Sequence, residues 1–307
     1  IFFIGIIIGI LSRLIMLHLD QKQYPTEPNI LLSQLVLAFV ASALGSLLVP
    51  ALIERSYTSI TLLCFAAQQF RQVSDNRRDT IQNLEDVQLI QRGNAFIEEI
   101  ARTYEVRNYT CIVTSFLAVG IYYIISSEFK LGDTTSIIIS SICGLALAFI
   151  LKKLLTRQRI GDIADVVPSK ISFVDECIMQ IGELKGITNI GLEVDREKYL
   201  SQGLGIEIIP KDKSYANVGT IYDPGQRQAI IYNIYSRIGI LREEDEPAFY
   251  PLPRMNLNNG SLMIAVVPVD KDINKLIDAV KSCPILSSAK GKNVSLKNYK
   301  IDKKGSV

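Results

Sequence analysis

Long apolar runs separated by charged segments are the feature that most constrains this fold. The run from Ile30 to Leu52 supplies the roughly twenty apolar residues that a helix needs to cross a bilayer. Cys111 to Ser126 and Thr134 to Leu151 form two further runs, and the short polar connection between them predicts a transmembrane hairpin. Ile1 to Leu17 is interpreted as the end of a first span, with Arg13 stretching its charge toward the interface; the alternative interpretation is a buried functional charge. We therefore expect about four spans.

The distribution of basic residues predicts which side of the membrane each segment occupies. The two short connections between spans hold only Lys22 and Lys130. Arginines are frequent in the long middle segment and follow the last span: Arg55, Arg71, Arg77, Arg78, Arg92, Arg102, Arg107, Arg157 and Arg159. Because basic loops stay in the cytoplasm, this predicts a multi-pass protein of the cell membrane with both termini cytoplasmic.

The middle segment, residues 54–109, is predicted to be a series of cytoplasmic helices. Ser56 to Val73 has an amphipathic pattern, and whether it inserts in the membrane stays open. The polar stretch from Ser74 to Asp79 predicts a break before a second helical piece, and Gly93 to Tyr109 predicts a helix that leads into the third span.

One charged face of this region is the candidate partner-binding or hinge site. Glu98 and Arg102 are spaced for an ion pair across one helical turn. Together with Gln69 and Arg71, they are predicted to line a polar site or to dock a partner. The alternative interpretation is a charged helix face in contact with solvent.

From about Gly161 the pattern becomes that of a soluble α/β domain. Gly205 to Pro210 and Ser261 to Val269 are rich in β-branched residues and predict strands. Asp223 precedes Pro224 and is predicted to cap a helix, and further helices are predicted after Asp195 and Asp270. The predicted fold class is thus a multi-helix transmembrane half, residues 1–160, followed by a small cytoplasmic α/β domain, residues 161–307. Lysines give that domain a basic tail, predicted to be a solvated end or a lipid contact: Lys290, Lys292, Lys297, Lys300, Lys303 and Lys304.

The residue types leave few catalytic options. The chain has five scattered cysteines and one histidine, without a CxxC pair, which argues against a zinc site and a disulfide framework. The net charge of +2 gives no overall basic field of the kind that nucleic-acid binding requires, and no cofactor motif occurs. The weak catalytic candidates, for a membrane-associated protease, are Glu98, Asp162 and Asp165, the last two spaced to pair across one helical turn.

Small residues recur at four-residue steps within the predicted spans. Ala41 and Gly45 follow this spacing, as do Ser140, Gly144 and Ala148. Such faces let helices approach closely, so we expect helix packing and, as partners, membrane lipid and a protein or a second copy of the chain. A small-solute channel formed by self-association is the third function that the pattern leaves open.

Several segments resemble one family of membrane proteins. Ala95 to Ala101, AFIEEIA, resembles the Tyr-Ile-Glu-Gly-Ile-Ala signature of the YIEGIA family from spore-forming Firmicutes, as do Val49 to Val73, YEVRNY, LDQKQYP and GQRQAI near Gln226. Phe96 and Glu99 depart from the signature, which has Tyr and Gly there. Both changes favour a structural helix over a catalytic loop. The resemblance implies a polytopic membrane protein associated with sporulation or spores. Its α/β domain is expected to bind or regulate a partner, and a membrane-bound hydrolase is the alternative.

Overall fold

The computed structural model describes residues 1–23, 28–128, 132–212, 215–244 and 246–290. The chain divides into two compact units. Residues 1–80 and 100–156 form a helical unit, and residues 81–99 join residues from 157 onward in an α/β unit. The predicted basic tail beyond Lys290 lies outside the described residues.

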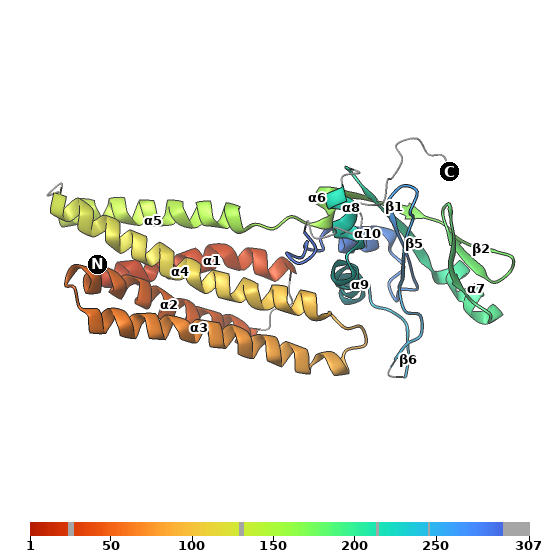
Figure 1. Ribbon diagram of the computed structural model, residues 1–307, viewed down its shortest axis with the longest axis horizontal. Helices are drawn as coiled ribbons and strands as arrows, with labels where there is room; N and C mark the ends of the chain where they lie inside the picture. The colour runs from red at the N-terminus through yellow and green to blue at the C-terminus, as the bar shows by residue number, and fades with distance from the viewer. Residues whose placement is uncertain (24–27, 129–131, 213–214, 245, 291–307) are drawn as a thin grey trace. The chain divides into compact units, whose positions relative to one another are not determined.

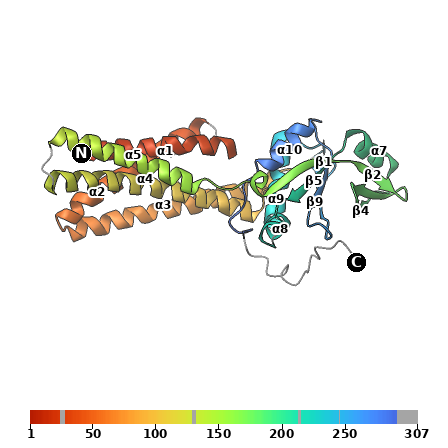
Figure 2. The same cartoon turned by 90° about the horizontal axis from the view of Figure 1, so that it is seen from above.

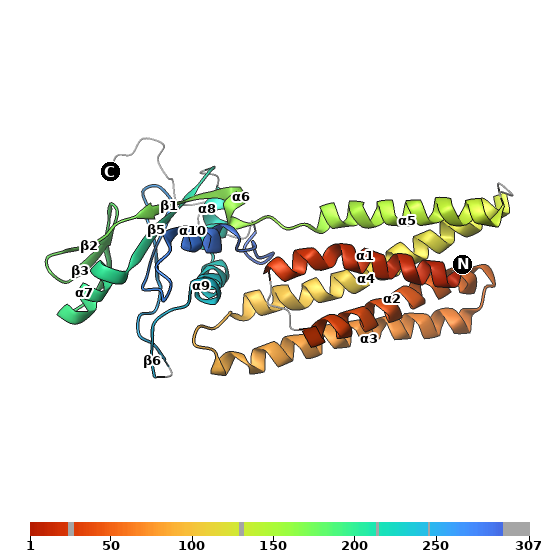
Figure 3. The same ribbon diagram turned by 180° about the vertical axis from the view of Figure 1, so that it is seen from behind.

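The helical unit is built from long helices that lie side by side in Figures 1 and 3. Three of them are long and apolar enough to cross a membrane, over Leu31–Ile53, Asn94–Glu128 and Asp133–Leu155, while Phe2–Met16 is a shorter apolar helix. The full bounds are α1 Phe2–Gln23, α2 Pro28–Ile53, α3 Tyr57–Asn83, α4 Asn94–Glu128 and α5 Asp133–Leu155. Helix α1 contacts α2 and α5.

The predicted break at Ser74 to Asp79 is wrong, because α3 runs through it without interruption. The stretch contains neither glycine nor proline, the residues that most strongly disfavour a helix. Ser74 instead donates a hydrogen bond from Oγ to the Ala101 carbonyl, and Arg78 forms exposed ion pairs with Asp75 and Asp79. The polar side chains of this stretch form hydrogen bonds and ion pairs on the surface of α3, and they do not end the helix.

Small and polar side chains fill the inside of the helical unit. A Cβ atom at Gly9 would overlap Ser42, and one at Gly45 would overlap the backbone of α4. The predicted small-residue spacing therefore does bring helices together within one chain, and on α5 it buries Ser140, Gly144 and Ala148. Large apolar side chains are exposed instead: Phe3, Ile7, Leu32, Val36, Phe39, Ile138, Ile142 and Phe149. Self-association through the same faces stays a prediction.

The α/β unit is centred on an antiparallel sheet with the strand order β1-β5-β9-β8. Its two inner strands confirm the predicted ones. The bounds are β1 Ala164–Ser169, β5 Leu204–Pro210, β9 Leu262–Val266 and β8 Leu252–Met255. Every residue of β9 is buried, so both faces of the sheet are covered.

Two different layers cover those faces. Figure 2 shows α8 to α10 on one side of β1, β5 and β9, with α7 and a second small sheet on the other. Met263 and Ala265 of β9 belong to the core on the small-sheet side, together with Ile181 and Tyr199. The bounds of these layers are α8 Tyr215–Tyr222, α9 Pro224–Ile238, α10 Ile273–Lys281, α7 Glu193–Gln202, β2 Ile171–Val174, β3 Ile178–Ile181 and β4 Leu184–Asn189. Short elements complete the unit: η1 Glu85–Val87, α6 Ile160–Ile163, β6 Arg242–Glu243 and β7 Glu246–Pro247.

The helix starts follow local capping chemistry. Asp223 accepts a hydrogen bond from the Gln226 amide and Pro224 occupies the first turn of α9, as the sequence predicts. Helix α10 begins two residues later than expected, because Asp272 and not Asp270 caps it. It ends at Lys281, shortly before Pro284.

Candidate functional site

The segment from Glu85 to Glu99, which carries most of the signature residues, packs against α9 within the α/β unit. Gly93 precedes α4 with a φ of +85°, a conformation that glycine adopts without strain. Its carbonyl accepts hydrogen bonds from the Phe96 and Ile97 amides, at 3.0 and 3.1 Å, so it starts the helix. A Cβ at Gly93 would lie 2.9 Å from Gln228 Cγ, which requires glycine for a second reason.

A charged and aromatic group fixes the approach to the helix. Glu85 accepts from Arg92 Nη1 at 3.2 Å and from the Gly93 amide at 3.1 Å. The Arg92 guanidinium lies over the Tyr232 ring at 4.9 Å, and Phe96 meets the same ring edge to face at 6.0 Å. Tyr232 of α9 is thus held by two residues of the segment.

The two segments that resemble the family signature contact each other. Gln228 Nε2 donates to the Gln91 carbonyl at 2.6 Å. A Cβ at Gly225 would lie 2.7 Å from the Ala95 Cβ, so the start of α9 can approach α4 only because position 225 lacks a side chain. AFIEEIA and GQRQAI therefore form one interface, although more than a hundred residues separate them in the chain.

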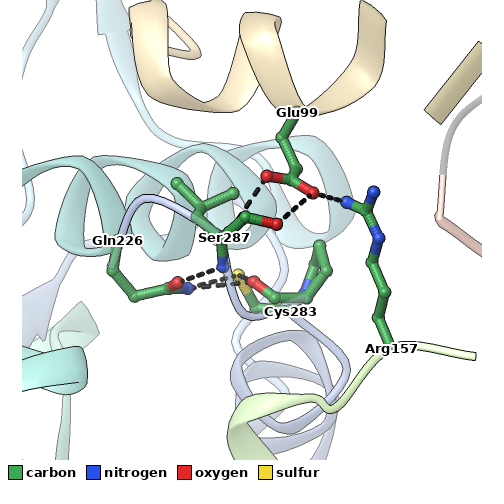
Figure 4. A network of polar contacts seen from close by, with 7 residues as sticks. Glu99, Arg157, Gln226, Cys283 and Ser287 are labelled. Carbon is green, nitrogen blue, oxygen red and sulfur yellow. Dashed lines mark hydrogen bonds and ion pairs between the residues drawn. The ribbon is translucent and has the colours of Figure 1, made fainter. Parts of the chain in front are cut away.

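Figure 4 shows Glu99 in contact with both Ser287 and Arg157. Its carboxylate accepts from the Ser287 amide at 3.0 Å and from Ser287 Oγ at 3.1 Å, and it forms an ion pair with Arg157. The Glu99 side chain is only 4% exposed, so these donors replace the water that the charge has lost. We call Glu99, Arg157, Gln226, Cys283 and Ser287 the signature junction.

Gln226 holds the other side of the same loop (Figure 4). Its Nε2 donates to the Pro284 carbonyl at 3.0 Å, and its Oε1 accepts from the Leu286 amide at 2.8 Å. Nε2 also lies 3.7 Å from Cys283 Sγ. Complete burial raises the pKa of the Cys283 thiol to about 12, which keeps it protonated at neutral pH.

This chemistry makes the signature junction a structural connection and not a reactive centre. Both Glu99 oxygens are engaged by donors, and the only thiol present is protonated and buried. A nucleophilic cysteine needs a lowered pKa, which is the opposite of what burial produces here. Among the described residues, no group of three His, Cys, Asp or Glu side chains is placed to hold a metal ion.

An open groove lies beside the same segment. Residues 86–89 line one part of it, and the end of α9 with Tyr235, Ile240 and Arg242 lines another. Its volume is about 580 Å³, and Val87 is 77% exposed. The groove offers both apolar and charged contacts beside residues 86–89, at the start of the segment that leads to α4.

The residues predicted as a binding face lie on the surface. Glu98 and Arg102 are exposed on α4, and Gln69 and Arg71 are exposed on α3. They stay predictions as a partner-binding or hinge site.

The two predicted catalytic aspartates do not share a helical turn. The short helix α6 ends at Ile163, so Asp162 lies in a helix and Asp165 in strand β1. Asp162 accepts from the Arg159 amide at 2.7 Å, and exposed Asp165 lies 3.8 Å from Lys211 Nζ. Helix-start and surface contacts thus account for both carboxylates.

The sequence gives only weak signals for the signature junction. Glu99 is visible as the charged residue where the resembled signature has glycine. Gln226 occupies the third helical position, where its side chain is expected to bond back toward the cap; instead it reaches the loop at Pro284. Arg157 and Ser287 carry no local pattern that marks them.

Comparison with known proteins places the whole chain in one group. A family described as YIEGIA protein matches residues 1–296. A protein of Bacillus subtilis (strain 168), described as uncharacterized protein YphB, is 31% identical over 291 residues, which cover 93% of this chain and 91% of that protein. No solved structure matches the chain significantly.

Proposed function

This chain belongs to the YIEGIA protein family, and we propose that it is a multi-pass cell-membrane protein whose helices anchor a cytoplasmic α/β domain that binds a protein partner. The observation that carries the membrane part is the polarity of the helical unit. Serines, threonines and glycines are inside, while Phe39, Ile142 and Phe149 are exposed. In water this arrangement exposes large apolar side chains at a free-energy cost, whereas in lipid it is favourable.

We propose that α1 adds a fourth span to the three long apolar helices, since it packs against α2 and α5. The basic residues near Arg78 and Arg102 favour a cytoplasmic location for the end of α3 and the start of α4. Since Gly5 lies against Val119 and Ser12 bonds Thr114, α1 runs antiparallel to α4, which places the end of α1 on that same side and its start on the opposite side. Cysteine accessibility tests this in a cysteine-free background, with one cysteine placed at Glu128 and another at Arg78. An impermeant maleimide should label position 128 in intact cells and position 78 only after lysis. Labelling of both in intact cells would refute the topology.

The proposed setting is sporulation or the spore. It is supported by the resemblance to proteins of spore-forming Firmicutes and by the Bacillus subtilis relative, and by no residue of the site itself. Deletion of the gene should lower the yield or germination of heat-resistant spores and leave vegetative growth unchanged. Normal spores from the deletion strain would contradict this part.

We propose that the partner binds in the groove beside the signature segment. A side chain as exposed as Val87, set at the edge of a concave surface, supports this choice over the flat charged faces. Arg242 and Glu244 at its edge add charges that can orient a bound chain.

The test is in-cell crosslinking of the full-length chain followed by pull-down from sporulating cells. Truncation is unsuitable, because removal of residues from 161 onward would also leave residues 81–99 without the contacts described above. Val87→Glu should abolish capture of the partner that the wild-type chain retains. The matched control is Leu200→Glu, another exposed apolar position of the same unit. Equal capture by both variants would exclude the groove as the partner site.

A further inference from the structure

Arg13 is buried inside the helical unit and does not reach outward as the sequence suggests. It is 1% exposed, and its Nε and Nη1 atoms have no hydrogen-bond partner. A buried guanidinium with unbonded donors carries a large desolvation penalty, which a bound anion or water relieves. Tyr104 and Cys111 of α4 lie near Arg13, and neither side chain is a carboxylate.

Two further arginines gather around the same point. Arg107 of α4 is close enough to Arg13 for the two charges to repel each other. Arg77 of α3 places its guanidinium 5.3 Å from the centre of the Tyr104 ring, and Tyr104 also lies near Arg13. We call Arg13, Arg77 and Arg107 the arginine cluster. The charges of Arg13 and Arg107 lie close enough to repel, which favours an anion beside Arg13.

Polar side chains extend this position. Gln34 is 2% exposed, donates from Nε2 to the Tyr104 hydroxyl at 3.4 Å, and leaves its Oε1 without a partner. Thr110 and Thr114 are buried one and two turns beyond Arg107. The buried atoms without a hydrogen-bond partner are thus Nε and Nη1 of Arg13 and Oε1 of Gln34, and they lie beside positive charge. Such atoms are available to bind a polar ligand.

The position of the cluster along the helices indicates the class of anion. Arg13 lies near the end of the apolar stretch Phe2–Met16, and Arg107 lies four residues before the apolar run that begins at Cys111. In a membrane this is the depth of the lipid headgroups, where phosphate is the abundant anion. Guanidinium groups match phosphate oxygens well in charge and in donor geometry.

We propose that the arginine cluster binds a phosphate group, supplied either by an anionic phospholipid headgroup or by free inorganic phosphate. The lipid source rests on the proposed membrane location, whereas the phosphate source does not. Phosphate oxygens accept from the Arg13 donors and reduce the repulsion between Arg13 and Arg107.

The experiment uses the full-length chain in a neutral detergent. Native mass spectrometry counts bound phosphatidylglycerol, with phosphatidylcholine as the lipid of zero net charge. In a separate titration, inorganic phosphate is added and thermal unfolding is followed by far-ultraviolet circular dichroism. The variants are Arg13→Gln and Arg107→Gln, and the control is Arg78→Gln, an arginine on α3 that pairs with Asp75 and Asp79.

We expect at least a tenfold rise in the dissociation constant for Arg13→Gln and no change for Arg78→Gln. If phosphatidylglycerol binds the wild type and Arg78→Gln but binds Arg13→Gln weakly, the ligand is the lipid headgroup. If inorganic phosphate raises the melting temperature with the same dependence on these variants, the ligand is the free ion. If Arg13→Gln does not fold, Arg107→Gln carries the same test, with Arg13→Lys as the charge-retaining comparison.

The inference is overturned if the wild-type chain binds neither ligand, or if Arg13→Gln and Arg107→Gln bind as the wild type does. Carbonate extraction of membranes reports separately on insertion. Loss of carbonate-resistant association refutes the proposed membrane location, whereas retained insertion without phosphate binding refutes the cluster alone.

Discussion

Removal of the Glu99 carboxylate tests the signature junction most directly. In Glu99→Ala, the Ser287 amide loses its acceptor and Arg157 loses its buried counter-ion. Breaking a buried ion pair by removing one partner costs about 3–5 kcal/mol. Because Arg157 is 24% exposed and regains some hydration, we expect the lower end, about 3 kcal/mol.

The effect should be local to the loop that Glu99 holds. Hydrogen exchange measured by mass spectrometry reports the free energy of local opening for peptides that contain Leu286 and Ser287. A loss of about 3 kcal/mol corresponds to about 100-fold faster exchange, at about 1.4 kcal/mol for each factor of ten. The matched control is Glu98→Ala, the exposed neighbour on the same helix, for which we expect a change within about 0.5 kcal/mol.

Glu99→Gln separates charge from hydrogen bonding. It keeps an acceptor for the Ser287 amide but removes the ion pair with Arg157, so its effect should lie between those of Glu98→Ala and Glu99→Ala. Equal exchange of the Ser287 peptide in Glu99→Ala and in Glu98→Ala would refute the role of Glu99 in holding the loop.

Four further expectations follow from glycine and cysteine positions. Gly93→Ala should lower stability by about 1–3 kcal/mol, measured by thermal unfolding, because a side chain is strained at a φ of +85°. Gly45→Val should abolish correct packing of α2 against α4, seen as rapid proteolysis, whereas Gly120→Val, with nothing within 4 Å of its Cβ, should not. Cys283 should resist alkylation at pH 8.5 while exposed Cys64 reacts. The stability that protonated Cys283 contributes is complete below pH 9 and is lost as pH rises toward about 12, so Cys283→Ala should weaken this part of the alkaline destabilisation.

Sequence patterns predict those features of the fold that depend on residues close together in the chain. The inner strands β5 and β9 consist of β-branched runs, and Asp223 with Pro224 marks the start of α9 through contacts within one turn. The sequence patterns do not predict strands β2 to β4. These strands are short, and they pair through turns at Asp175, Glu176 and Gly182, where the backbone has positive φ values that hydrophobic periodicity does not indicate.

The signature junction depends on long-range contacts, which local patterns do not encode. The sequence points to Glu98 because its spacing to Arg102 is a local pattern, whereas Glu99 bonds residues far along the chain. Arg13 illustrates the same limit. Its place near the end of an apolar run suggests an outward side chain, but the side chain is buried near Tyr104 and Cys111 of α4.

The contact between Glu99 and Ser287 sets an order of events during synthesis. Ser287 leaves the ribosome 188 residues after Glu99, which at about 5–20 residues per second is a delay of about 10–40 seconds. During that interval the rest of α4, α5 and most of the α/β unit are made, and the segment from Glu85 to Glu99 has no α9 to contact until Ile238 has been added. Phe96 and the Glu99 charge are then without their final neighbours. The loop at Ser287, made late in synthesis, thus completes a structure that begins with the segment from Glu85 to Glu99. Until then, a chaperone or the membrane surface can bind that segment.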